Sequence, residues 1–232
     1  MMEAAAILRY TDIDLKKQTG TTPVIVANSL MRRRDDIDLA AFQQHWLDPH
    51  GPLTAKLPGC RHYVQNHVLD SVGSNTLARS LRIDGIPQLA FASPEDRMAA
   101  HGSAELKACD KDSELFIGAV SRLITAVEGD AAFEGPPGSV KQILLFVAPS
   151  PPSKETAGEA ILDELQGVRR FVRHEIVQQT HAPGSRVPNL EVPIEGLCEV
   201  WLSDIDAVAR NAALLDRHRG VASFVVKVYR FI

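Results

Sequence analysis

The sequence has few cysteines and lacks the motifs of disulfide and metal chemistry. Its 232 residues include three cysteines, Cys60, Cys109 and Cys198, which form no Cys-x-x-Cys pair. An odd number of scattered cysteines argues against a disulfide scaffold and fits free thiols in a reducing compartment. The eight histidines form neither an HExxH motif nor a cluster with zinc-ligand spacing. We therefore expect no disulfide and no metal site.

Long apolar runs and an excess of basic charge are also missing. No run approaches the roughly 20 apolar residues that cross a bilayer. The apolar run at residues 4–8 is short and has no basic start, unlike a signal peptide. The net charge is −4, and the basic cluster at residues 32–34 is followed at once by Asp35 and Asp36, as at a solvated strand end. We expect a soluble, cytoplasmic protein without membrane or nucleic-acid partners.

The most informative stretch that is present runs from Asp38 to Val68. Its first part has apolar and aromatic residues and one histidine at steps of three and four, the spacing of one helical face: Phe42, Trp46, His50, Leu53 and Leu57. Asp38 is placed to cap this helix. Pro49 and Pro52 interrupt its hydrogen-bond ladder, which predicts a kink or a fresh helical start near His50.

A strand is predicted next, from Cys60 to Leu69. Alternation along it puts Tyr63, Gln65 and His67 on one face and His62, Val64 and Asn66 on the other. A polar group that faces a core must be paired or must line a cavity. The pattern therefore predicts a pocket beside this strand.

Three segments of this part of the chain read HWLDPHGPLTAKLPG at residues 45–59, RHYVQNHV at 61–68 and IDGIPQLAF at 83–91. They resemble the EthD family, named after a protein of ethyl tert-butyl ether degradation. The resemblance implies a dimeric α+β barrel, in which ferredoxin-like units pack their sheets face to face. Members of that superfamily include cofactor-free monooxygenases, cyclases, lactone isomerases and haem enzymes, so the fold alone does not define the chemistry.

The remaining pattern predicts the order β-α-β-β-α-β twice. In the first half we expect strands at 23–30, 60–69, 83–92 and 120–127, a helix from Ser93, a short helix at 113–118 and a polar loop at 70–82 that forms a pocket lip. In the second half we expect strands at 140–148, from Val168, at 194–202 and at 221–229, and helices at 154–166 and 205–215.

The two halves align with each other. Leu57-x-Gly59-x-Arg61-x-Tyr63-Val64 matches Leu165-x-Gly167-x-Arg169-x-Phe171-Val172, and Ile83-Asp84-Gly85-Ile86 matches Ile194-Glu195-Gly196-Leu197. We predict an α+β chain of two ferredoxin-like repeats packed sheet to sheet, an intrachain dimeric α+β barrel. Its parts are an N-terminal arm (1–22), a site-bearing repeat (23–128), a linker (129–139) and a diverged repeat (140–232). A homo-oligomer built by edge contacts is then compatible with the fold but not required.

We expect the site residues in the first repeat, because the second repeat lacks their counterparts. His50 aligns with Gly158, Trp46 with Lys154 and His67 with Glu175. Candidate catalytic residues are His50, a general base or acid, with His67 and Tyr63 polarising or positioning an oxygen. Candidate substrate-binding residues are Phe42, Trp46, Gln65 and Asp84.

Each candidate also has a structural interpretation. His50 could instead bond a backbone carbonyl freed by Pro52, and Tyr63 could pack in the core, as its counterpart Phe171 suggests. Asp84 repeats as Glu195 in the half without His50, which favours a role in the turn over one of orienting a histidine.

These features favour a cofactor-independent enzyme that acts on a small hydrophobic molecule, aromatic or polyketide-like, by His-assisted proton transfer. The reaction would be that of a cyclase, dehydratase, isomerase or oxygenase. The alternatives are a non-catalytic ligand-binding or accessory protein of catabolism with the same barrel, and a haem-dependent relative.

Overall fold

The computed structural model describes residues 24–69, 73–127, 133–148, 158–180 and 185–232. The strands are β1 (Val24–Arg33), β2 (Cys60–Val68), β3 (Gly85–Phe91), β4 (Ile117–Val127), β5 (Val140–Val147), β6 (Val168–Thr180), β7 (Ile194–Leu202) and β8 (Val221–Arg230). The helices are α2 (Leu39–His45), the π-helical turn η2 (Trp46–His50), α3 (Gly51–Thr54), α4 (Thr76–Leu81), α5 (Pro94–His101), α6 (Ala104–Ser113), α7 (Gly158–Glu164) and α8 (Ile205–Arg217). The expected N-terminal arm and residues 129–132 of the expected linker lie outside the described ranges.

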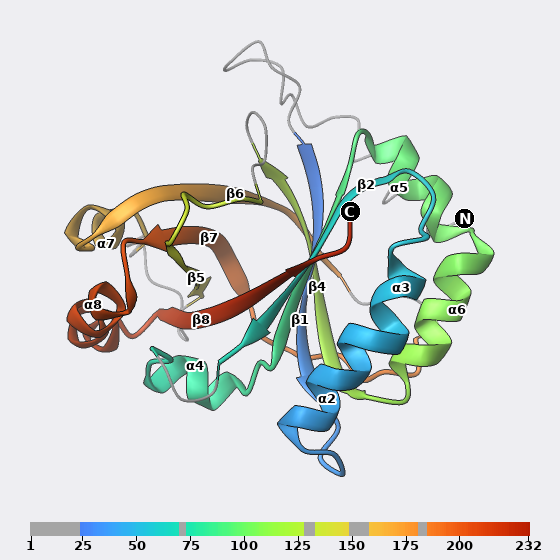
Figure 1. The fold of residues 1–232 in the computed structure, drawn as a ribbon, viewed down its shortest axis with the longest axis horizontal. Helices are drawn as coiled ribbons and strands as arrows, with labels where there is room; N and C mark the ends of the chain where they lie inside the picture. The colour runs from blue at the N-terminus through green and yellow to red at the C-terminus, as the bar shows by residue number, and fades with distance from the viewer. Residues whose placement is uncertain (1–23, 70–72, 128–132, 149–157, 181–184) are drawn as a thin grey trace.

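The described strands close into an antiparallel barrel in the order β1-β3-β2-β8-β5-β7-β6-β4 (Figure 1). The fold is therefore of the mixed α+β class, as expected. The two sheets do more than face each other, because β2 pairs with β8 and β4 pairs with β6. Each seam satisfies backbone groups that an open sheet would leave at its edge.

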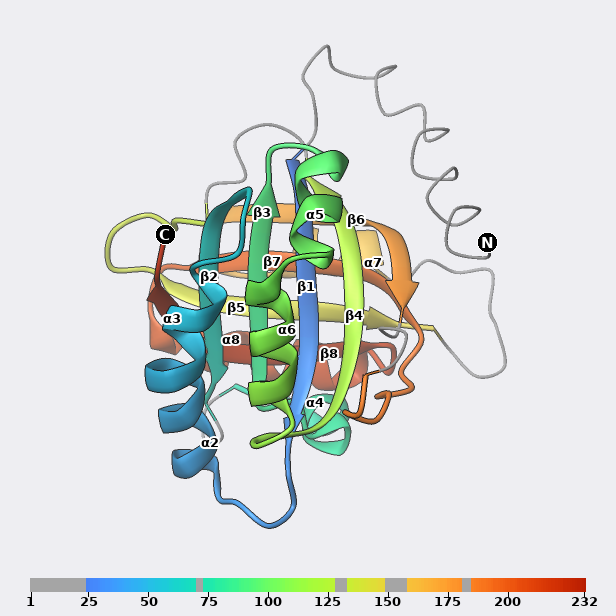
Figure 2. The ribbon, with the colours of Figure 1, turned by 90° about the vertical axis from the view of Figure 1, so that its right-hand side faces the viewer.

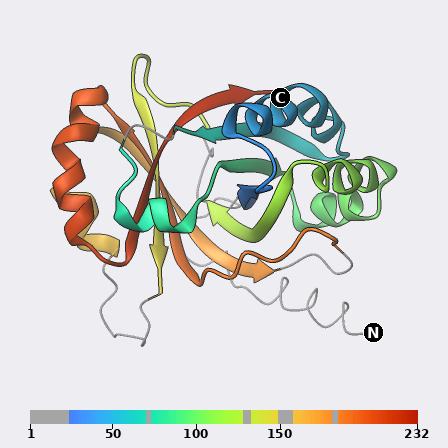
Figure 3. The same cartoon turned by 90° about the horizontal axis from the view of Figure 1, so that it is seen from below.

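Helices cover the outside of the barrel on two opposite sides. One side, over β1 to β4, carries α2, α3, α5 and α6, and the other side, over β5 to β8, carries α7 and α8 (Figures 2 and 3). The inside is filled by alternate residues of strands from both halves, including Leu30, Leu123, Ile143 and Leu145, each at most 1% exposed. One apolar core thus joins the two halves of the chain. Among the described residues, no helix is long and apolar enough to cross a membrane.

The helix starts follow the capping residues. Asp38 caps α2 by accepting a hydrogen bond from the amide of Ala41, and Ser93 caps α5 with Pro94 in its first turn. Near His50 the expected break takes the form of the π-turn η2, which contains Pro49, and α3 begins directly after it. Wider π-helical turns are often found at functional sites.

Two expectations about the first half were wrong. The region 70–82 is not all loop, because Asn75 caps the helix α4 through the amide of Ala78. The helix expected at 113–118 lies earlier, as α6, because the Ser103 side chain caps it through the amide of Leu106. A helix in a short polar segment is difficult to predict, because it has too few apolar residues to show a helical period.

Candidate active site

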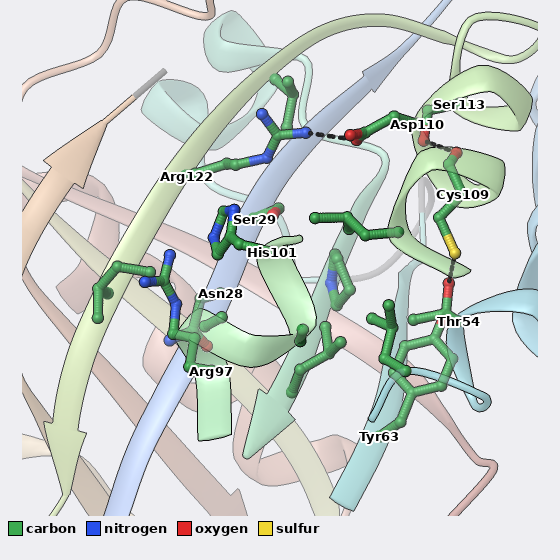
Figure 4. Close-up of a pocket in the computed structure, with 18 of the residues that line it drawn as sticks. Asn28, Ser29, Thr54, Tyr63, Arg97, His101, Cys109, Asp110, Ser113 and Arg122 are labelled. Atoms are coloured by element: carbon green, nitrogen blue, oxygen red, sulfur yellow. Dashed lines mark hydrogen bonds and ion pairs between the residues drawn. The ribbon is translucent and has the colours of Figure 1, made fainter. Parts of the chain in front are cut away.

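A cavity of about 560 Å³ lies between the outer face of the first-half strands and the helices α3, α5 and α6 (Figure 4). Apolar side chains from β1, β3 and β4 form its floor, among them Met31, Leu89, Phe91 and Ile124. Met98, on α5, is 40% exposed and lies at its mouth. Such a volume with apolar walls suits a small hydrophobic molecule. The expected lip at 70–82 does not line this cavity, since none of its described residues does.

His50 lines the cavity and is 7% exposed. Its Nδ1 lies 2.8 Å from Oδ2 of Asp112, on α6. An ionised carboxylate can only accept, so Nδ1 carries the hydrogen and Nε2 keeps its lone pair. Burial lowers the pKa of His50, and the hydrogen bond and negative charge of Asp112 only partly oppose this. His50 is therefore a neutral imidazole at pH 7, in the form that a general base requires.

The helical break explains how two histidines reach the same carboxylate. His45 Nε2 lies 3.2 Å from Oδ1 of Asp112, and His45 and His50 flank the wider π-turn. Its hydrogen bonds span five residues, the same spacing as these two histidines. Phe116 stacks on the His45 ring and meets the His50 ring edge-on, so both imidazoles are held in place.

Tyr63 lines the same cavity and is 1% exposed. Gln65 Nε2 donates to the Tyr63 hydroxyl oxygen at 2.7 Å and to the Trp46 carbonyl at 2.7 Å. Gln65 Oε1 therefore faces His67 Nε2, which donates to it at 2.8 Å. Burial raises the pKa of Tyr63, so its phenol keeps its hydrogen. Because the Tyr63 oxygen already accepts from Gln65, its own O–H can donate to another group.

The other sequence candidates lie away from the cavity lining. Phe42 and Trp46 are fully buried in a core cluster with Phe116, and Trp46 stacks on the His67 ring at a centroid distance of 4.3 Å. Asp84 pairs with Arg33 instead of a histidine and accepts from the Arg33 amide at 2.8 Å. The structure thus brings together His50 and Tyr63 at the cavity and links His67 to Tyr63 through Gln65.

Two residues, one beside the cavity and one in its lining, were not found from the sequence. Asp112, the partner of His50, lies 62 residues further along the chain, and Arg122, on β4, lies beside Asp110. A histidine and an acid so far apart are brought together only by packing of α6 against η2. A correct prediction of α6 would have placed Asp112 within reach of the first helix.

A second polar cluster, inside the barrel, was also missed. Glu199 Oε1 lies 2.6 Å from His174 Nε2 and accepts from Gln88 Nε2 at 2.9 Å, and Glu199 Oε2 lies 2.5 Å from Lys141 Nζ. All four residues are at most 3% exposed. Burial alone would raise the pKa of Glu199, but the charge of Lys141 and the hydrogen bond from His174 hold it below its usual range.

The interior cluster is buried among the strands, whereas His50 and Tyr63 line a cavity. Among the described residues, no group of three or more His, Cys, Asp or Glu side chains is arranged to hold a metal ion. The outer cavity, with His50 and Tyr63 in its wall, is therefore the candidate active site.

The fold and this cavity define an α+β barrel protein with a pocket between sheet and helices. Residues 34–119 match the family model of the EthD domain, as the motifs in this part of the sequence indicated. A search of curated proteins returned no match.

One solved structure resembles the fold over most of the chain. An anthrone oxidase-like protein superposes with a TM-score of 0.56 at 13% identity, covering 90% of this chain and 94% of that one. An EthD family protein from Bacillus halodurans covers 44% of this chain and 96% of its own, at 23% identity and a TM-score of 0.36. At these identities the first likeness shows a shared fold and nothing about chemistry.

Proposed function

We propose that the protein is an enzyme that moves a proton on a small hydrophobic substrate without a cofactor. The observation that carries the proposal is His50 in the wall of the cavity, with its Nδ1 held by the carboxylate of Asp112. The pair supplies a base of suitable protonation state and a carboxylate that orients it, and the cavity beside it offers space for a substrate. The Tyr63 hydroxyl in the same wall supplies a hydrogen-bond donor.

The proposed step is removal of a proton from a carbon made acidic by a carbonyl group. His50 Nε2 takes the proton. The electron pair of the broken C–H bond forms a C=C bond, and the π pair of the carbonyl moves to its oxygen, which gives an enolate. Asp112 stabilises the resulting imidazolium, and the Tyr63 hydroxyl donates to the developing oxyanion. His67 and Gln65 act through Tyr63. His67 orients the Gln65 amide, and Gln65 donates to the Tyr63 oxygen, which leaves the Tyr63 O–H to donate to the substrate. The enolate can then cyclise, lose water, isomerise or react with dioxygen.

The apolar lining favours an aromatic or polyketide-like substrate. The name of the fold relative, anthrone oxidase-like, suggests a convenient probe. Anthrone has a methylene group whose proton is acidified by two rings and a conjugated ketone. Exchange of that proton for deuterium reports on proton removal alone, whichever later step the enzyme performs.

The test is the rate of deuterium exchange at the anthrone methylene, measured by NMR. The His50→Gln variant should lose about 10²- to 10⁴-fold of the accelerated exchange, the usual share of a general base. Asp112→Asn should weaken the reaction less and alter its pH profile, because the base loses its negatively charged partner. His62→Gln is the matched control, since His62 is exposed on the same strand as Tyr63, outside the cavity lining.

Two results would favour the alternatives. If anthrone binds but exchange is no faster than in buffer, and a wider set of carbonyl compounds behaves alike, the protein is a ligand-binding or accessory protein. A Soret band in the purified protein would favour the haem-dependent alternative.

We further propose that the chain is a fused pair of ferredoxin-like repeats, residues 23–128 and 140–232. Support comes from the strand order, which is β4-β1-β3-β2 in one half and β8-β5-β7-β6 in the other. Gln88 and Glu199, which occupy the same position in the two aligned halves, contact each other across the barrel. Contact between equivalent residues is expected where a pseudo-twofold axis passes.

A further inference from the structure

The cavity has a charged side as well as an apolar floor. Arg97 and His101, on α5, and Arg122, on β4, lie together on one side, and Thr54 and Tyr63 lie on the other (Figure 4). Among the described residues that line the cavity, the one carboxylate is that of Asp110, and two of the residues are arginines.

Arg122 is the residue with unused hydrogen-bonding capacity. Its Nη2 donates to Asp110 Oδ1 over 3.4 Å, a long contact to a carboxylate whose side chain is 47% exposed. Its Nη1 is buried and has no hydrogen-bond partner among the described residues. The guanidinium side chain is only 22% exposed, and burial lowers the pKa of Arg122 although Asp110 opposes this. A buried donor on a charged group is costly to leave unpaired.

We infer that Arg122 anchors the acidic group of the ligand, so that the cavity takes an aromatic or polycyclic acid. This inference deepens the proposed function and rests on the same cavity. A carboxylate or phenolate oxygen in the cavity would pair with the Arg122 guanidinium, which must turn to present its buried Nη1, since guanidinium groups pair well with such oxygens. The apolar floor then holds the ring system, and the far end of the molecule lies at the side of Tyr63 and Thr54.

His50 belongs to that far side, because it precedes Thr54 by four residues across the start of α3 and shares its face. The substrate is thus held by its acid at one side while its reacting carbon lies at the other. This arrangement gives orientation, which a purely apolar pocket does not supply.

A matched pair of fluorescent dyes tests the anion site without any reaction. 8-Anilinonaphthalene-1-sulfonate and N-phenyl-1-naphthylamine share one ring skeleton, and only the first carries an acidic group. Arg122→Gln should weaken binding of the sulfonate dye about 10- to 100-fold, the range for loss of a charge-assisted hydrogen bond. The neutral dye should be unaffected, and Arg122→Lys should restore part of the lost affinity. Arg219→Gln, an exposed arginine outside the cavity, should change neither affinity.

Asp110→Asn provides a second, independent measurement and applies also if Arg122→Gln does not fold. Removal of this carboxylate frees Arg122 Nη2, so the sulfonate dye should bind several-fold more tightly. Equal effects of Arg122→Gln on both dyes, or unchanged sulfonate affinity in either variant, would overturn the inference.

The outcomes also separate this inference from the proposed function. If neither dye binds the folded wild-type protein, the cavity itself is not a ligand site and both proposals fail. If the dye pattern holds but His50→Gln leaves anthrone exchange unchanged, the acid site stands and catalysis by His50 is rejected. His50→Gln should in any case keep the affinity for the sulfonate dye, because His50 lies on the other side of the cavity.

Discussion

His67 is a polar residue that is buried and yet does not line the cavity. It is 2% exposed, stacks on the Trp46 ring, meets the Tyr229 ring edge-on and donates to Gln65. Burial, together with the positive charge of Lys227, lowers the pKa of His67 to about 4. The protonated form is therefore strongly disfavoured in the folded protein, and His67 stays a neutral donor to Gln65.

This burial predicts a pH dependence of stability. In the unfolded chain His67 binds a proton near its ordinary pKa of about 6.5, whereas in the folded protein it binds one only near pH 4. Between these values the unfolded state holds more protons, so the free energy of unfolding should fall as the pH drops from 6.5 towards 4.

Urea unfolding of the wild type and of His67→Gln at pH 7, 6, 5 and 4 measures this effect. The variant should lose part of the slope that the wild type shows across this range, although its stability at pH 7 is lower. Parallel curves for the two proteins would mean that His67 does not titrate in this way.

At the scale of elements, the first helical segment decides the character of the site. A regular helix over residues 39–54 would direct His45 and His50 to different sides, whereas the π-turn with Pro49 lets both reach Asp112. The segment also needs a close approach to the sheet. An added Cβ at Gly85, on β3, would lie 2.4 Å from a ring carbon of Trp46.

Gly85→Ala should therefore destabilise the protein by about 1–3 kcal/mol, because the Trp46 ring must move to relieve the overlap. The shift should also disturb His67, which stacks on that ring. Chemical denaturation measures the loss. Gly102→Ala is the matched control, since its Cβ would come no closer than 4.0 Å to another atom and its backbone is helical. Equal stability of the two variants would contradict this packing argument.

At the scale of the whole molecule, the closed barrel makes the two halves depend on each other. The interior apolar cluster draws on strands of both halves, and the seams β2–β8 and β4–β6 join them by hydrogen bonds. The buried cluster around Glu199 adds Gln88 from one half to Lys141 and His174 from the other. Separation of the halves would expose all of these groups together.

The chain should accordingly unfold in one cooperative transition, and its two tryptophans can report on it. Trp46 lies in the first half and Trp201 in the second, and both are at most 3% exposed. In Trp46→Phe the fluorescence follows the second half, and in Trp201→Phe it follows the first. In each variant the fluorescence midpoint in urea should coincide with that of circular dichroism, as two-state unfolding requires. Midpoints that differ within one variant would indicate two independently folding units.

The sequence by itself determined the elements whose signals are local. Capping residues, proline positions and alternation predicted α2, the break near His50, the start of α5 and the two faces of β2. The motif residues indicated the match to the EthD domain model. It also indicated His50 and Tyr63, because a histidine on an apolar helical face and a polar strand face are visible in one short window.

Only the tertiary structure decided which residues meet. Asp112 and Arg122 have no local sequence feature that indicates their roles. Asp112 lies 62 residues after His50 in the chain and reaches it only because α6 packs against η2. Arg122 is distinguished only by its buried Nη1, which has no hydrogen-bond partner among the described residues. The seams that close the barrel were equally hidden, because pairing between distant strands depends on register and burial in three dimensions. Asp84, by contrast, has a partner at the adjacent strand end, Arg33, and so lies away from the cavity.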